Sequence, residues 1–269
     1  MSKSKVELRL SLLTVFLLIL LSHCATIYQP PSLRPLSEQD VETILSKIQE
    51  QDSRVFSFYT SGRLTIKNWN WKSESNILIV GTRDPFKIKI EVTHPWGRPI
   101  VHILIDKTRL EVLSFPEKKL YFGTFTPRAL SRFFPGDFDA HLIWAVLRGY
   151  PNLRRYHRTI SLKSDQISLF NEKEKVVEVV DLYPESLLPK LVSFPEQDIT
   201  LAFSDFQEDN GIYYARKVRL ENVEGKRNLV LKNRKMVFNK TIPEQVFFLE
   251  KPPSFGTFYL DENLNKARP

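Results

Sequence analysis

The stretch Phe86-Lys87-Ile88-Lys89-Ile90-Glu91-Val92 alternates apolar and charged side chains without a break. Successive side chains of a β-strand point to opposite faces, so this pattern predicts a strand with one dry face and one wet face. Such strands are typical of antiparallel sheets that pack one face against a core and leave the other in water. The stretch therefore favours an antiparallel β protein.

The same period of two recurs along most of the chain, and each run ends near Gly, Pro, Asn or Asp. We expect about eleven strands in a mainly β (α+β) fold, as a single curved antiparallel sheet that forms an unclosed β barrel around an apolar cavity. The runs are 54–66, 86–92, 101–105, 110–112, 120–122, 160–162, 167–170, 176–182, 188–194, 199–206, 212–221 and 228–239. The tail beyond Pro252 is less regular and is expected to be extended.

Three segments have the period of a helix and are expected to cover the sheet. Ser37 can cap a helix whose apolar residues Val41, Ile44, Leu45 and Ile48 share one face. Thr126 and Pro127 begin a second helix. A third helix follows Asp139 and stops at Gly149.

A large curved sheet with an apolar inner face can enclose a ligand cavity or can be filled by its own side chains. Periodicity does not separate these two alternatives. If a cavity exists, its candidate lining comes from the inner positions of the strands and from the third helix. These candidates are Phe56, Phe58, Leu64, Ile66, Phe86, Ile88, Ile90, Val101, Ile103, Leu142 and Val146.

The N-terminus reads as a targeting segment. Lys3, Lys5 and Arg9 precede the apolar run 10–21, which is shorter than the roughly 20 residues that a spanning helix needs. The run is followed by Cys24, the only cysteine of the chain. We interpret residues 1–23 as a lipoprotein signal peptide, 24–36 as a flexible tether from acylated Cys24, and 37–269 as one β domain. The residue before the cysteine is His23 rather than a small one, so an ordinary secretory signal is the alternative.

Charge and reactive residues argue against several function classes. The net charge of +8 is modest. The chain has a basic cluster at Arg154, Arg155, His157 and Arg158, but no nucleic-acid recognition motif lies beside it. We therefore expect this cluster to be a solvated loop, and we expect no nucleic-acid partner. The histidines are scattered, no metal-ligand spacing occurs, and there is no glycine-rich phosphate loop. We therefore expect no enzyme, no catalytic residue, no metal and no cofactor.

Three short motifs carry a resemblance to a known family. They are the aromatic-to-glycine start 58–64, the turn Thr93-His94-Pro95-Trp96-Gly97, and the helix end 147–151. In order and spacing these motifs resemble the LolB family of outer-membrane lipoprotein receptors, which has the LolA/LolB lipoprotein-localisation fold. The resemblance covers roughly residues 40–155.

The resemblance implies a helix-covered, unclosed barrel that receives the acyl chains of a lipoprotein from a periplasmic LolA-like carrier. The chain would then release that lipoprotein into the outer membrane. The apolar residue of the family's protruding loop falls on Trp96, so Pro95, Trp96 and Gly97 would form a membrane-insertion loop; a core position for Trp96 is the alternative. The expected protein is a monomer, anchored to outer-membrane lipid and facing the periplasm. The alternative function is a structural or adaptor lipoprotein of the same fold that binds a lipid or a protein without transfer.

The lipid anchor gives a first testable prediction. Changing Cys24 to Ala removes the only thiol that could accept a diacylglycerol, so the variant should not incorporate radioactive palmitate and should leave the membrane fraction. Wild-type labelling and fractionation of this variant would show that the anchor does not depend on Cys24.

Overall fold

The computed structural model describes residues 34–68, 72–134, 138–222 and 227–261. The interpreted signal peptide, Cys24 and residues 24–33 of the tether lie outside this range. The described part belongs to one compact unit that begins at Arg34. None of the helices in the described part is both long and apolar enough to cross a bilayer.

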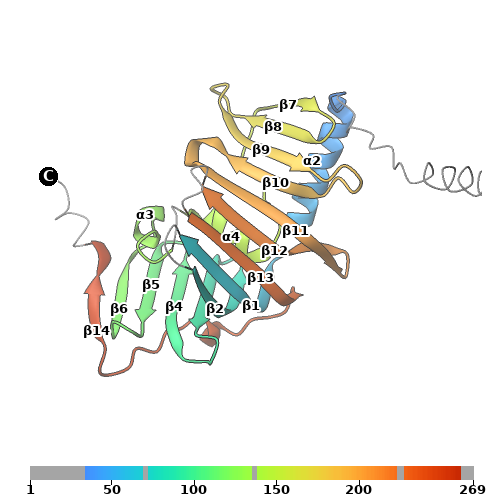
Figure 1. The fold of residues 1–269 in the computed structure, drawn as a ribbon. Coiled ribbons are helices and arrows are strands. Elements are labelled where there is room, and N and C mark those ends of the chain that lie inside the picture. Colours follow the sequence, from blue (N-terminus) through green and yellow to red (C-terminus); the bar gives the residue numbers. More distant parts are fainter. Residues whose placement is uncertain (1–33, 69–71, 135–137, 223–226, 262–269) are drawn as a thin grey trace, which may run out of the picture. The chain divides into compact units, whose positions relative to one another are not determined.

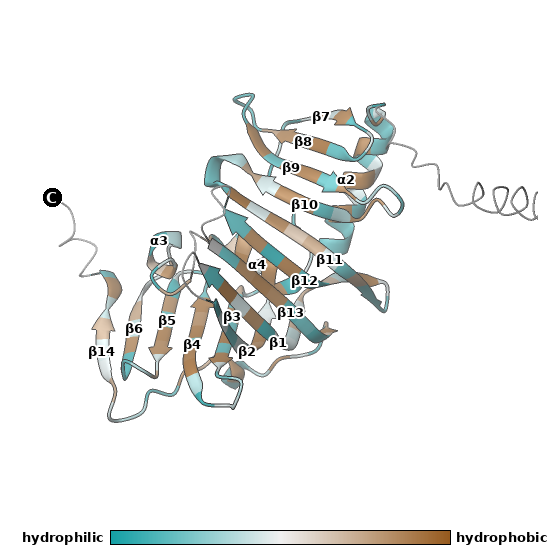
Figure 2. Cartoon of the chain, in the orientation of Figure 1, coloured by the Kyte–Doolittle hydropathy of each residue, from teal (hydrophilic) through white to brown (hydrophobic). Residues whose placement is uncertain are grey.

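The described residues form 14 strands in one sheet, together with helices α2 (Glu38–Ser53), α3 (Pro127–Leu130) and α4 (Ala140–Arg148). The strands run in the spatial order β14-β6-β5-β4-β3-β2-β1-β13-β12-β11-β10-β9-β8-β7, which can be followed in Figure 1 and, for β3, in Figure 2. Neighbouring strands are antiparallel except for β14 and β6, which are parallel. β14 and β7 lie at opposite ends of this order, so the sheet is curved but unclosed, as expected from the sequence.

The strand bounds are β1 Ser57–Asn68, β2 Lys72–Thr82, β3 Lys87–Thr93, β4 Pro99–Asp106, β5 Arg109–Ser114, β6 Lys119–Thr124, β7 Arg158–Lys163, β8 Gln166–Phe170, β9 Val176–Leu182, β10 Pro189–Phe194, β11 Ile199–Asp209, β12 Ile212–Asn222, β13 Arg227–Phe238 and β14 Gly256–Tyr259. The sequence pattern missed β2 and β14. β2 contains the unbroken apolar run 77–80, so it does not show the alternation of a strand with one wet face. Val80, on its outer face, is partly covered by the smaller apolar cluster there. β14 has only four residues, which is too short for a pattern.

The inner face of the sheet carries the main core. Figure 2 shows apolar and hydrophilic residues alternating along many of the strands, which places the apolar set on one face. In β3 the pattern is strict: Ile88, Ile90 and Val92 are buried, and the charged residues between them are half-buried. The apolar faces of α2 and α4 pack into the same cluster. The two helices therefore cover the inner face, as predicted.

The predicted helix ends are confirmed. The Ser37 side chain accepts a hydrogen bond from the backbone of Asp40 at the start of α2. Thr126 and Asp139 cap α3 and α4 in the same way. Gly149 ends α4 with a left-handed backbone, φ 76°, and a Cβ there would lie 2.6 Å from the carbonyl oxygen of Ala215 in β12. Only glycine fits both the turn and this close approach.

The outer face has a second, smaller apolar cluster. After β13 the chain crosses the outer face, where Phe247 and Leu249 pack on Leu104 and Leu113, and the chain then adds β14 beside β6. The segment between β13 and β14 thus covers apolar residues of β4–β6 that would otherwise face water.

Candidate functional site

The candidate site is a cavity between the centre of the sheet and the helices above it. We call α3, α4 and the described residues between them the helical cover. The cavity is lined only by apolar side chains. They are Leu64, Ile77, Ile90, Ile105, Leu229 and Leu231 from the sheet, and Leu130, Phe134, Phe138, Ile143, Val146 and Leu147 from the cover. Its volume is about 30 Å³, which is space for only one or two water-sized groups.

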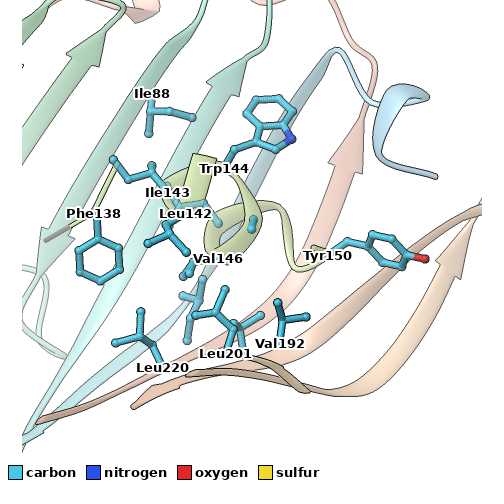
Figure 3. Packing of buried hydrophobic residues seen from close by; sticks show 14 of the residues in the cluster. Ile88, Phe138, Leu142, Ile143, Trp144, Val146, Tyr150, Val192, Leu201 and Leu220 are labelled. Atoms are coloured by element: carbon cyan, nitrogen blue, oxygen red, sulfur yellow. The ribbon is translucent and has the colours of Figure 1, made fainter. Parts of the chain in front are cut away.

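α4 covers the cavity because its apolar residues recur with the period of a helix. Ile143, Val146 and Leu147 are separated by three and four residues and so lie on one face, towards the cavity. Figure 3 shows α4 with apolar side chains on several sides, among residues of the two halves of the sheet. Leu142 and Trp144 are also buried, so this helix has hardly any polar face. Such a helix is stable only while the sheet covers it.

A buried polar network holds one end of the cover in place. Asp52, at the end of α2, accepts hydrogen bonds from Arg83 (2.7 Å) and from the Trp144 indole (3.2 Å). Arg148 of α4 is fully buried, donates to the carbonyl of Gln51, and has its Nε 4.0 Å from Asp52. Burial lowers the pKa of Arg148 to about 10. A buried charge without its partner is strongly destabilising, so this network fixes α4 against α2 and the end of β2.

The candidate lining residues have four outcomes. Leu64, Ile90 and Val146 line the cavity. Phe58, Ile88, Ile103 and Leu142 are buried in the same core without lining it, and Ile66, Phe86 and Val101 are half-buried against that core. Phe56 is wrong: its side chain is 56 % exposed.

The error at Phe56 has a local cause. β1 begins at Ser57, and the backbone N–H of Phe56 donates to the Asn239 side chain instead of joining the ladder. The strand alternation therefore does not extend back to this residue. Conversely, the sequence did not single out Phe134 and Phe138 as lining, because they reach the cavity from the cover and not from a strand.

The Pro95-Trp96-Gly97 turn is exposed and tightly built. It joins β3 to β4, and hydrogen bonds of 2.8 Å close it, from the His94 backbone to Arg98 and from Gly97 to His94. Gly97 has φ 92°, a conformation that favours glycine. The Trp96 side chain is 77 % exposed and its ring stacks on the His94 ring at 4.7 Å. The expectation of an exposed tryptophan is confirmed, whereas a core position is wrong.

A second buried polar cluster lies where the chain leaves α4 and meets β9. The backbone N–H of Arg154 donates to Glu178 (2.9 Å), and the Arg154 guanidinium donates to Asp139 (2.9 Å) and Gln197 (2.8 Å). Glu178 is fully buried, and this burial raises the pKa of its carboxyl to about 7. Burial also lowers the pKa of His141, whose Nδ1 lies 3.0 Å from the Asn152 amide nitrogen. Arg154, expected in a solvated loop, is thus partly buried and bonded.

This cluster fixes the segment after α4. Asp139 accepts from the backbone N–H of Leu142 and from the Arg154 guanidinium, and Glu178 accepts from the backbone N–H of Arg154. Across residues 34–68, 72–134, 138–222 and 227–261, no group of three or more His, Cys, Asp or Glu side chains is arranged to hold a metal ion.

Glu178 gives a prediction for the pH dependence of stability. Its pKa is 4.5 in ordinary surroundings and about 7 in the fold, so the unfolded chain loses this proton first. The Glu178 contribution therefore makes the free energy of unfolding fall as the pH rises from about 4.5 to about 7. The Glu178→Gln variant should lose this fall and, at pH 8, be more stable by about 3 kcal/mol.

Urea unfolding of the variant and the wild type between pH 5 and pH 8 measures both effects. Glu172→Gln, at an exposed glutamate, is the matched control and should behave like the wild type. Equal stability of Glu178→Gln and the wild type at every pH would contradict the assigned pKa.

Solved structures with a similar arrangement identify the fold. A LolA superfamily protein from Nitrosomonas europaea matches with a TM-score of 0.51 and 15 % identity, over 77 % of this chain and 97 % of its own. An outer membrane lipoprotein-sorting protein domain from Vibrio parahaemolyticus matches with 0.51 and 14 %, over 77 % and 96 %. A DUF1329 family protein from Desulfovibrio piger matches with 0.54 and 11 %, over 81 % and 98 %.

At these low identities the structural likeness shows a shared fold and nothing more. No family model and no curated protein matches the sequence. The LolA-like fold expected from the sequence is therefore confirmed, while the likeness does not single out the LolB family.

Proposed function

We propose that the protein binds acyl chains of lipoproteins between the sheet and the helical cover, and that it helps to insert those lipoproteins into the outer membrane. The observation that carries this proposal is the cavity itself, whose twelve lining side chains are all apolar. Ligand sites in proteins are usually apolar with a few polar groups that fix orientation, and a wholly apolar lining suits a hydrocarbon chain. The fold shared with a LolA superfamily protein and a lipoprotein-sorting domain supports the same ligand class.

The cavity of about 30 Å³ is much smaller than an acyl chain, so binding requires the helical cover to move away from the sheet. The exchange is energetically reasonable. Burial of an acyl chain contributes about 0.8 kcal/mol per methylene group, hence roughly 8 kcal/mol for ten groups. The bound acyl chain also replaces the helical cover as the apolar partner of the inner face of the sheet. Binding is thus a substitution of one apolar surface for another.

Trp96 is proposed as the group that meets the bilayer. Its ring is apolar with a single N–H, a combination that suits the membrane interface. The tight turn presents this ring 77 % exposed, and no reorganisation is needed to bring it to a membrane surface.

The proposed anchor, tether, orientation and partner are those expected from the sequence. Cys24 would carry the acyl anchor, residues 24–36 would tether the β domain, and the domain would face the periplasm as a monomer. The partner that supplies lipoproteins would be a LolA-like carrier. Transfer without an energy source must run downhill in free energy from carrier to receptor to membrane.

An adaptor lipoprotein of the same fold is the second candidate function, because the cover is closed over a small cavity and is held by the Asp52 network. Depletion separates the two functions. Loss of a transfer factor causes unrelated lipoproteins to accumulate in the inner membrane, whereas loss of an adaptor does not.

Filling the cavity tests the binding step. The Val146→Phe substitution adds a ring where the lining leaves space for one or two small groups, so it should weaken binding of a diacylated lipopeptide at least tenfold. Native mass spectrometry of the complex measures this, with circular dichroism to confirm folding. Leu162→Phe, at a side chain 70 % exposed on β7, is the matched control and should bind normally. Undiminished binding by a folded Val146→Phe protein would remove the cavity from the mechanism.

The Trp96→Glu substitution tests the insertion step. A carboxylate cannot enter the apolar part of a bilayer cheaply, so transfer of the lipopeptide from the protein into liposomes should fall at least tenfold, while binding is unchanged. Tyr59→Glu, at another exposed aromatic residue, should transfer normally. Wild-type transfer by Trp96→Glu would exclude a role for the turn.

A further inference from the structure

A second hollow lies beside α2. It is about 450 Å³ in volume, and it shares no lining residue with the cavity. α2 forms one wall, and Tyr150, Tyr213 and the turn between β9 and β10 form the others. Its lining is Ile44, Lys47, Ile48, Glu50, Gln51, Tyr150, Ser186, Leu187, Leu188 and Tyr213.

The lining has the composition of an amphiphile site. Four aliphatic side chains and two tyrosine rings line it, together with a few polar groups, and its volume lies within the range of about 300–1,000 Å³ that is usual for ligand pockets. The cavity under the cover offers far less room without movement.

Two opposite charges stand at this hollow. Lys47 and Glu50 lie three residues apart on α2 and are both exposed, and neither side chain forms a hydrogen bond or an ion pair with a described residue. Gln51 is different, because its amide group is already bonded to the backbone of Gly211 and Tyr213 at 3.0 Å. The charged groups left for a ligand are therefore one ammonium and one carboxylate.

Tyr150 adds a polar group at the inner end. Its ring lies against the core, and Figure 3 shows its hydroxyl pointing away from the labelled aliphatic side chains. Burial raises the pKa of this hydroxyl to about 12, so it remains protonated and can donate a hydrogen bond.

We propose that this hollow binds a single-chain zwitterionic amphiphile, of the chemical class of a lysophospholipid with an ethanolamine head. The alkyl chain lies against Ile44, Ile48 and Leu188. Lys47 pairs with the phosphate and Glu50 with the ammonium of the head. This site goes beyond the proposed function, since it needs neither movement of the helical cover nor the Trp96 turn.

The test uses the full chain in phosphatidylcholine vesicles and a 16-carbon lysophosphatidylethanolamine with a diazirine at the end of its chain. After irradiation, peptide mass spectrometry locates the adducts. The expected adducts lie in residues 44–51 and 186–188. Adducts spread over the surface, or confined to other segments, would overturn the proposal.

Variants test the two halves of the site separately. Leu188→Trp fills the hollow and should lower labelling of residues 44–51 at least tenfold. Lys47→Glu leaves the wall intact and places two carboxylates at the hollow, so labelling should fall about fivefold. Glu42→Lys, at an exposed residue of α2 outside the hollow, should label like the wild type. Labelling unchanged in both Leu188→Trp and Lys47→Glu, or equal labelling by a neutral long-chain alcohol probe, would refute the site.

Val146→Phe distinguishes this site from the cavity. It should weaken lipopeptide binding at least tenfold without changing labelling of residues 44–51, because the two sites share no lining residue. Loss of both signals in a folded Val146→Phe protein would show one continuous site and contradict the second one.

Discussion

The packing of an almost wholly apolar helix against the inner face of an unclosed sheet is the contact on which the rest of the structure depends. A sheet whose edges, β14 and β7, do not meet leaves one apolar face without a partner sheet. α4 supplies that partner at the centre through Ile143, Val146 and Leu147, and α2 does so beside it. Each apolar surface is stable in water only while the other covers it.

The position of the cover is set by polar contacts rather than by the apolar ones. Hydrophobic packing is non-directional, whereas the carboxylate of Asp52 is shared by Arg83 and the Trp144 indole at fixed distances, with Arg148 close by. These groups meet α4 at its middle, through Trp144, and at its last residue, Arg148. The Arg83 guanidinium also lies over the Trp144 ring, 4.7 Å from its centre. The opposite side of the cover, around Leu130 and Phe134, has apolar contacts with the cavity. Movement of the cover at that end would leave the polar network intact.

The alternating strands and the helix ends can be predicted from the sequence because both signals come from residues close together in the chain. Ser37, Thr126 and Asp139 begin the helices as expected, and the alternation of β3 appears as buried and half-buried positions. The sequence pattern missed β2 because its outer residue Val80 is apolar and packs against the segment between β13 and β14. The sequence of the strand alone does not reveal that contact.

Most of the candidate site depends on contacts between distant segments. The Asp52 network joins residues 92 and 97 positions apart in the chain, and no pattern marks such a pairing. The volume of the cavity is likewise decided by side chains such as Phe138, which reach it from outside the sheet. Trp96 was accessible to prediction because the flanking Pro95 and Gly97 require a tight turn, which usually lies at the surface.

The most direct test of the account is the distance between the helical cover and the sheet when an acyl chain is bound. Spin labels at Arg128→Cys on α3 and Ser61→Cys on the exposed side of β1, in a Cys24→Ala background, report this distance by pulsed electron resonance. Addition of a diacylated lipopeptide should lengthen the distance and shift most of the population. A bound lipopeptide with an unchanged distance distribution would contradict the claim that the cover gives way to the ligand.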